Sequence, residues 1–173
     1  MLQDADSQSA IVVESGYYGS ELRWDAYNDV FQEIVECAEI VVDETRRTGL
    51  WTSFSVEIGY VSPAFVSATR CRDPGIRRRA IVVLLTVARQ EGIWQSTGAA
   101  AIAQRWVDIE EEGLSNIACS ADVPELQRIA RVSTMVHVDS QTGHLEFFLA
   151  DGTRRHETVC WGPMKSLVMN SNL

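Results

Sequence analysis

The residues of this chain best suited to covalent chemistry are a cysteine between two arginines and a set of three histidines. Cys71 lies between Arg70 and Arg72, whose positive charges could lower the pKa of its thiol. The same cysteine falls at the end of an expected helix, on an apolar face, which favours an unreactive thiol in the core. Because the chain also lacks a GxSxG nucleophile elbow, we expect no catalytic residue.

The histidines offer the ligands of a metal site without the spacing of one. His137, His144 and His156 all fall in an expected sheet, where two on facing strands could bind a metal together with Glu146. No HExxH or other local ligand spacing accompanies them, so we expect exposed histidines and no metal. The phosphate-binding patterns GxxxxGK(S/T) and GxGxxG are also missing from the sequence, and we expect no cofactor.

The cysteines are too far apart for a zinc motif. They are Cys37, Cys71, Cys119 and Cys160, and the closest two are 34 positions apart, so no CxxC pair exists. The first residues lack the basic and apolar regions of a signal peptide. We therefore expect reduced, mostly buried thiols rather than a disulfide framework, in a protein that is not secreted.

The densest positive segment of the chain contains Arg70, Arg72, Arg77, Arg78 and Arg79. It could contact phosphates or act as a nuclear import signal. The last three arginines, however, fall inside an expected helix and are flanked by core residues. We therefore favour pairing with acidic residues, because the arginine fork matches a carboxylate.

The acidic counterpart is the run of Asp108, Glu110, Glu111 and Glu112. Paired carboxylates can act as acid and base, but consecutive ones at a helix end are typical of a solvated face. Negative charge is unfavourable at the C-terminal end of a helix, so arginine partners are expected nearby. The predicted charge network, also a possible interaction surface, comprises Arg70, Arg72, Arg77, Arg78, Arg79, Glu110, Glu111 and Glu112.

Hydrophobic periodicity predicts the elements that must position these residues. Apolar residues recur at spacings of three and four in most of the expected helices, which are residues 22–47, 63–71, 74–88 and 97–112. Their end signals are N-caps at Ser62, Asp73 and Ser96 and glycine stops at Gly49 and Gly113. After residue 131 the period changes to two, and strands are expected at about 132–138, 145–149 and 156–161.

The pattern predicts a mostly α fold, an antiparallel helical hairpin stack followed by a small three-stranded antiparallel β-meander. We expect an irregular lead-in (1–21), a helical regulatory-type domain (22–120), a meander annex packed on the helices (121–162) and a tail (163–173). The 173 residues are 46% hydrophobic, too apolar for a disordered chain, and contain no apolar run of the ~20 residues that span a bilayer. The net charge of −9 argues against a nucleic-acid binder.

Three segments in order are distinctive: ATRCRDPGIRRRAI at 68–81, RQEGIWQS at 89–96 and WVDIEEEGL at 106–114. They resemble the pattern ATRCRDPxIRRxAIxLL…RREGxWDS…IExEEEG in the C-terminal part of fungal binuclear zinc-cluster transcription factors. The resemblance covers about residues 24–161, and a short β-rich end follows the helices in that family too. Gln90 and Gln95 stand where the family usually has Arg and Asp.

The resemblance implies regulation without a means of reading DNA. The family's N-terminal cluster of six closely spaced cysteines has no counterpart in this sequence, so no DNA-reading residue carries over. We expect a non-enzymatic transcription-regulator-like module that acts through a protein partner or self-association, without direct DNA or membrane binding. Nuclear localisation, or else cytoplasmic, and a role in a secondary-metabolite gene cluster are implied. The alternative is a small biosynthetic-cluster enzyme with a pocket between the helices.

Overall fold

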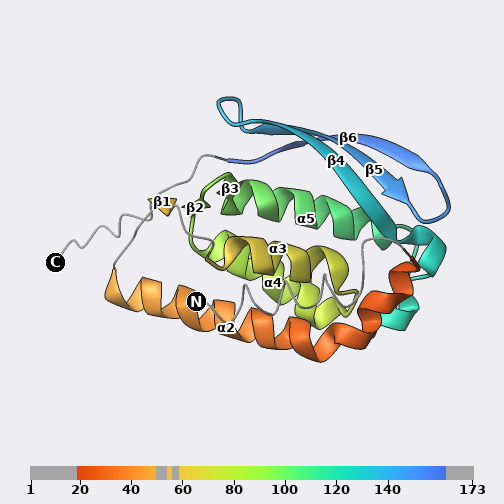
Figure 1. Ribbon diagram of the computed structural model, residues 1–173, viewed down its shortest axis with the longest axis horizontal. Coiled ribbons are helices and arrows are strands. Elements are labelled where there is room, and N and C mark those ends of the chain that lie inside the picture. Colours follow the sequence, from red (N-terminus) through yellow and green to blue (C-terminus); the bar gives the residue numbers. More distant parts are fainter. Residues whose placement is uncertain (1–18, 50–53, 56–58, 163–173) are drawn as a thin grey trace.

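The computed structural model describes residues 19–49, 54–55 and 59–162 (Figure 1). A short 3-10 helix, η1 (Glu21–Tyr27), leads into four α-helices: α2 (Asn28–Thr48), α3 (Val61–Arg70), α4 (Pro74–Thr86) and α5 (Ser96–Glu110). Two 3-10 turns, η2 (Ser120–Asp122) and η3 (Glu125–Gln127), precede the strands β4 (Ile129–His137), β5 (Thr142–Leu149) and β6 (Arg154–Cys160). The expected lead-in up to residue 18 and the expected tail from residue 163 lie outside the described residues.

Helices followed by a three-stranded antiparallel sheet are the expected order, and this order is confirmed. Successive α-helices run in opposite directions, and the sheet lies across α5 (Figure 1). The expectation of a mostly α fold is too strong, because the described residues also contain a second small sheet.

Helix α2 begins later than its apolar pattern suggests. Residues 21–27 form a 3-10 helix whose first turn is capped by Ser20, with the Leu22 backbone N–H donating to the serine hydroxyl at 3.2 Å. The other end is as predicted: Gly49 adopts a left-handed conformation (φ 64°) and its N–H donates to the Thr45 carbonyl. A glycine adopts this conformation without steric cost, which explains why the helix ends there.

Helix α3 begins at Val61, so the prediction that Ser62 caps it is wrong. The cap comes instead from Glu91, 30 residues downstream in the sequence. Its buried carboxylate accepts hydrogen bonds from the backbone N–H groups of Gly59 and Val61, at 2.9 and 3.0 Å. Because a carboxylate far away in the sequence accepts from these donors, the residues around the start of α3 do not indicate the cap.

Helix α4 begins where the sequence predicts. The Asp73 carboxylate accepts from the backbone N–H groups of Gly75 and Ile76 at 2.9 and 3.1 Å, and Pro74 occupies the first helical position. An aspartate cap followed by proline satisfies two end donors and removes a third. This cap fixes the tight connection between α3 and α4, in which Cys71 and Arg72 lie.

A small sheet that the sequence analysis did not predict connects α4 to α5. It consists of β1 (Phe54–Ser55), β2 (Gln90–Glu91) and β3 (Trp94–Gln95), with β1 parallel to β2 and β2 antiparallel to β3. Ser96 was predicted to cap α5, but it is the first residue of that helix. Its hydroxyl accepts from Arg89 N–H and donates to the Val87 carbonyl, so it closes this hairpin instead.

The larger sheet has the order β4-β5-β6, with both pairs antiparallel. Strand β5 begins at Thr142, three residues earlier than predicted, because Gln141 adopts a positive φ of 51° and turns the chain there. Leu145, Phe147 and Leu149 face the helices and are buried, whereas the residues between them face outward.

The core consists of three apolar clusters that meet at one side chain. Two lie among the helices, and the third joins Ile102, Trp106 and Ile109 of α5 to Phe147 of β5. The rings of Trp106 and Phe147 meet edge to face, 5.8 Å between centroids. Phe65 of α3 contacts all three clusters, so the sheet and the helices share one packed interior.

Candidate functional site

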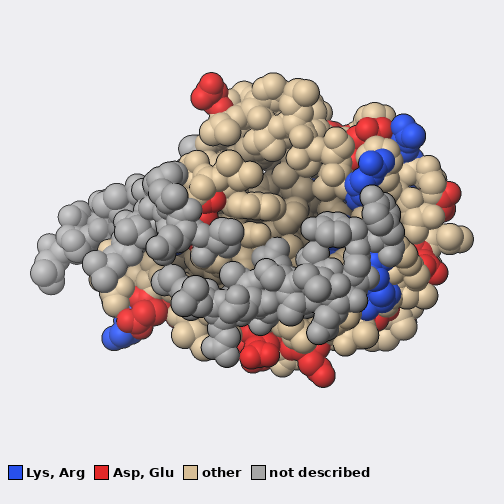
Figure 2. All heavy atoms as spheres, in the orientation of Figure 1, with Lys and Arg blue, Asp and Glu red and all other residues tan. Residues whose placement is uncertain are grey.

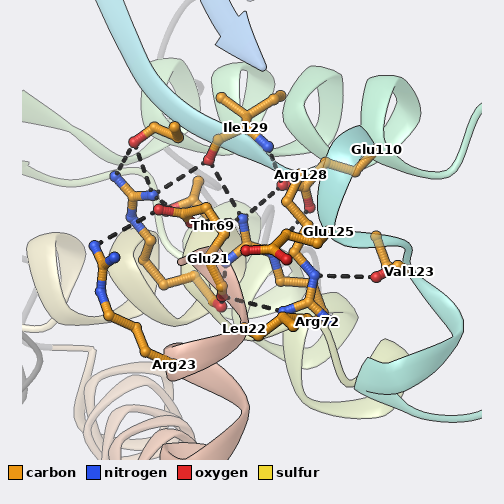
Figure 3. Close-up of polar contacts among 12 residues, drawn as sticks. Glu21, Leu22, Arg23, Thr69, Arg72, Glu110, Val123, Glu125, Arg128 and Ile129 are labelled. Atoms are coloured by element: carbon orange, nitrogen blue, oxygen red, sulfur yellow. Dashed lines mark hydrogen bonds and ion pairs between the residues drawn. The ribbon is translucent and has the colours of Figure 1, made fainter. Parts of the chain in front are cut away.

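The most unusual feature of the interior is a buried carboxylate held by two arginines. Glu110, the last residue of α5, is fully buried, as are Arg72 and Arg77. Arg72 donates to both Glu110 oxygens, Nη2 to Oε1 at 2.7 Å and Nε to Oε2 at 3.3 Å (Figure 3). Arg77 adds an Nη2 to Oε2 bond at 2.9 Å.

The Glu110 carboxylate also accepts hydrogen bonds from a side chain of α5 and from the backbone of β4. The indole N–H of Trp106, one turn earlier on α5, donates to Oε1 at 3.0 Å. The backbone N–H of Ile129 donates to the same oxygen at 2.8 Å, at the start of β4. One carboxylate thus connects α5, the α3–α4 connection, α4 and the first strand of the sheet.

A second carboxylate extends the cluster to the N-terminal helix. Glu21 of η1 is buried, and its Oε2 accepts from Arg70 at 3.0 Å and from Arg72 at 3.1 Å. The Arg70 guanidinium also lies over the rings of Trp24 and Trp106. Arg70 further donates to the carbonyl oxygen of Ala130, at the edge of β4.

A third fully buried arginine, Arg128, completes the cluster beside these residues (Figure 3). Its two terminal nitrogens bind both carboxylate oxygens of Asp25, at 2.7 and 2.8 Å. Its other bonds go to the backbone carbonyls of Glu21, Ser120 and Val123. Arg128 thus fastens η1 to the segment before β4.

Sequence reasoning missed Glu21, Asp25 and Arg128 altogether. They lie outside the arginine-rich and acid-rich runs, and each is an isolated charge in its own segment. The pairs Glu21–Arg72 and Asp25–Arg128 span 51 and 103 residues of sequence. No local pattern predicts pairs of that separation.

The electrostatics of the cluster favour charged side chains despite complete burial. Burial alone raises the pKa of the Glu110 carboxyl, but the charges of Arg72 and Arg77 outweigh it and hold that pKa below its ordinary value. For Arg72, burial lowers the guanidinium pKa, and the attraction of Glu110 more than restores it. Glu110 and Arg72 therefore form an ion pair at neutral pH, whereas burial lowers the pKa of the Arg77 guanidinium below its ordinary value.

The other predicted charges pair at the surface of the helices. Arg78 contacts Glu111 at 2.5 Å, Arg77 lies 3.5 Å from the same carboxylate, and Arg79 binds Glu39 of α2 at 2.7 Å. Glu112 pairs with Arg155 of β6. The expectation of a solvated acidic face is wrong for Glu110, because a helix end that packs under a sheet leaves no water around its inner carboxylate.

The buried ion pairs can stabilise the fold, but the buried arginines cannot contact a phosphate from solution. Arg72, Arg77 and Arg128 are fully buried, and their donors point at carboxylates and carbonyls. A phosphate could meet only the outer residues of the segment, Arg78 and Arg79, which are half exposed. On the face drawn in Figure 2, charged side chains lie mainly around the rim of the molecule.

The cysteines differ from expectation in one respect. None of the four forms a disulfide, but Cys119 and Cys160 are exposed, so the expectation of mostly buried thiols is wrong. Both lie in the irregular and sheet segments, which have one side in water. Cys71 is buried, its thiol donates to the side-chain oxygen of Asn28, and burial raises its pKa to about 12. Such a thiol carries almost no thiolate at neutral pH.

The histidines are exposed, as expected, and all lie in or at the ends of the larger sheet. His144 and His156 border a shallow hollow on its outer face, together with Glu146, Ser133 and Met135. His156 lies 3.8 Å from Glu146, and His144 contacts the Thr158 hydroxyl. Within the described ranges, no three histidine, cysteine or acidic side chains are grouped so that they could hold a metal ion.

Comparison of the chain with protein-family models, with curated proteins and with solved structures gave no match. Searching the described helices for a membrane span also gave none that is both long and apolar enough.

Proposed function

We propose that this chain is a non-enzymatic, transcription-regulator-like module that acts through protein contacts. The observation that carries the proposal is the division between charge and apolar surface. The arginine-rich segment is used mainly for internal pairing, whereas several large apolar side chains lie on the surface, among them Ile40, Val82, Leu85, Ile93 and Val136. Val82 and Leu85 are three residues apart on α4 and so lie side by side on its exposed face, and neighbouring exposed apolar side chains, unlike single ones, mark surfaces that contact other proteins.

The resemblance to the C-terminal part of fungal zinc-cluster regulators supports the same proposal. Two of its three motifs supply the residues around Glu110: Arg70, Arg72 and Arg77 come from the first, and Glu110 itself from the third. Glu91, in the second motif, caps α3. The motifs thus describe one scaffold, on which the apolar surface is displayed. Regulation of a biosynthetic gene cluster, in the nucleus, is the wider role that the resemblance suggests.

A comparison of cavities supports this proposal over the alternative of a small enzyme. The groove between α3 and β4 is lined mainly by Phe65, Val66, Trp94, Trp106 and Val132, an apolar set. Cys71 lies in the helical core and the histidines lie in the sheet. The cysteine and the histidines are therefore kept apart from this groove, whose polar lining residues are Ser62, Thr69, Arg70 and Arg131.

The test is to fuse the full chain to a heterologous DNA-binding domain and measure transcription of a reporter carrying its site. The expected result is a several-fold change, up or down, relative to the DNA-binding domain alone. The matched control is the same fusion with Glu110→Ala, which destabilises the module and should reduce the change. A folded, nuclear fusion that leaves the reporter unchanged would overturn the proposal.

A further inference from the structure

Strand β4 is an edge strand whose part from Val132 to His137 lacks the usual protection, whereas its start has a register shift between Ile129 and Arg131 and an Arg70 side chain bonded to the Ala130 carbonyl. Among the described strands it pairs with β5 alone, so one side of its backbone has no strand beside it. Edge strands of natural proteins are protected by lysine, proline or inward-pointing charge, because unpaired N–H and C=O groups otherwise recruit another chain. Residues 129–138, with the sequence IARVSTMVHV, contain neither lysine, proline nor an acid.

The helix-facing side of β4 extends beyond the part of the sheet that packs on the helices. In the register with β5, Val132 lies opposite Phe147 and is half-buried against the core. Val136 lies two pairs further along on the same face, yet its exposed fraction is 45%, and that of Val138 is 60%. Val136 is therefore on the helical side of the sheet yet nearly half exposed, and Val138 is exposed in the turn that follows the strand.

An apolar groove lies along the covered half of the same strand. It has a volume of about 390 Å³ and runs between α3 and β4. Ala130, Arg131 and Val132 line it on the strand, Phe65, Val66 and Trp94 line it on the other side, and Arg70 adds a second charged side chain. The space-filling view shows a hollow with mostly uncharged walls between the sheet and the helices (Figure 2).

We propose that β4 pairs with β4 of a second copy of this chain, antiparallel and about a two-fold axis at Thr134. In this register Val136 of one copy is placed beside Val132, on the rim of the groove of the other. The contact is self-complementary, as a two-fold interface requires, and it joins two three-stranded sheets into one of six strands.

The register follows from matching apolar residues to apolar residues. Moving the axis by one residue, to Ser133, would place Val136 opposite Ala130 and leave Val138 beyond the partner strand. The Thr134 axis instead pairs residues 131–137 of the two copies, sets Val136 beside Val132 and avoids Ala130, whose carbonyl is bonded to Arg70. The net charge of −9 on each copy opposes association, but the paired segment carries no acid, so the repulsion is not concentrated at the contact.

This inference deepens the proposed function, on which it rests, by naming the partner as a second copy. Sedimentation of the full chain over a wide concentration range tests it directly. We expect a monomer–dimer equilibrium that Val136→Lys shifts strongly toward monomer, because the substitution places a charge at two symmetric positions. If the charge weakens the dimer tenfold at each of the two positions, the dissociation constant rises about a hundredfold.

The matched control is Val82→Lys, at a similarly exposed valine on the outer face of α4. It should leave the dissociation constant unchanged. A chain that stays monomeric at every concentration overturns the pairing. The groove would then be left for residues 1–18 or for another protein. A dimer that Val136→Lys does not weaken also overturns the pairing. Neither result touches the proposed function, which the reporter assay tests separately.

Oxidative crosslinking tests the register. In a background with Cys119→Ser and Cys160→Ser, a thiol introduced by Thr134→Cys faces its own copy across the axis and should give a covalent dimer. Ser133→Cys, equally exposed on the same strand, faces Met135 of the second copy and should not. Crosslinking through position 133 in preference to position 134 overturns the register.

Discussion

At the scale of single residues, Glu110 has the largest influence in the described structure. It accepts hydrogen bonds from two buried arginines, one indole and one backbone N–H. A buried ion pair contributes little relative to an apolar replacement of the whole set, because both charges lose their hydration. Removing one member alone is different, because its partners are left charged and unpaired inside the protein.

We therefore predict that Glu110→Ala destabilises the protein by about 3–5 kcal/mol, the range for a broken buried pair. The control is Glu112→Ala, two residues away, which removes an exposed pair with Arg155 and should cost less than about 1 kcal/mol. Urea unfolding at neutral pH measures both. Equal losses for the two variants would contradict the role assigned to Glu110.

The lowered pKa of Glu110 also predicts how stability depends on pH. Above the ordinary glutamate pKa of 4.5 the carboxylate is ionised in the folded and unfolded states, and its stabilisation is complete. Below that value the unfolded chain takes up the proton first, so the free energy of unfolding falls as the pH falls through the folded-state pKa. Glu110→Gln should show a shallower fall between neutral pH and pH 3 in urea titrations, and an unchanged slope would contradict this.

At the scale of elements, the sequence predicts where a helix begins when the capping residue is its neighbour in the chain, and does not when that residue is far away. The start of α4 was predictable because its cap, Asp73, lies beside the helix that it begins. The start of α3 was not, because its cap is Glu91, a residue that looks like a helix terminator in sequence. The same limit applies to the site: the arginine and glutamate runs indicated paired charges, but not that Glu110 would be buried or joined by Arg128.

The dependence of α3 on Glu91 leads to a prediction at this scale. Glu91→Ala removes the acceptor of two buried backbone N–H groups and should cost about 2–4 kcal/mol, the penalty for two unsatisfied donors. Gln90→Ala, at the neighbouring position, loses only an exposed bond to Gly92 and should change little. Chemical unfolding compares the two variants.

Hydrogen exchange gives the second readout for the Glu91 prediction. The first turn of α3 should exchange faster in Glu91→Ala than in the unaltered chain, because its donors have lost their acceptor. Gly59→Ala should act similarly, since an added Cβ would lie 2.2 Å from a Glu91 oxygen and displace the carboxylate. Unchanged exchange in both variants would show that α3 does not depend on this cap.

At the scale of the whole molecule, the sheet and the helices are joined by apolar packing and by the buried charges. Phe147 of β5 contacts Trp106 of α5, while Glu110, one turn after Trp106, binds the first backbone N–H of β4. The meander therefore has its buried side chains in a core that it shares with α5. This predicts that the two parts unfold together.

Phe147→Ala should destabilise the protein by about 3–5 kcal/mol, through lost burial and the cavity left beside Trp106. The destabilisation should lower two unfolding midpoints equally: the midpoint of helix unfolding measured by far-ultraviolet circular dichroism, and the midpoint measured by tryptophan fluorescence. Thr158→Ala, on the outer face of β6, serves as the control and should shift both midpoints little. If the helical signal kept its midpoint while the fluorescence transition moved, the meander would be an independent unit. Its contact with α5 would then be an association between two domains, because a shared core cannot lose Phe147 without weakening the helices that enclose it.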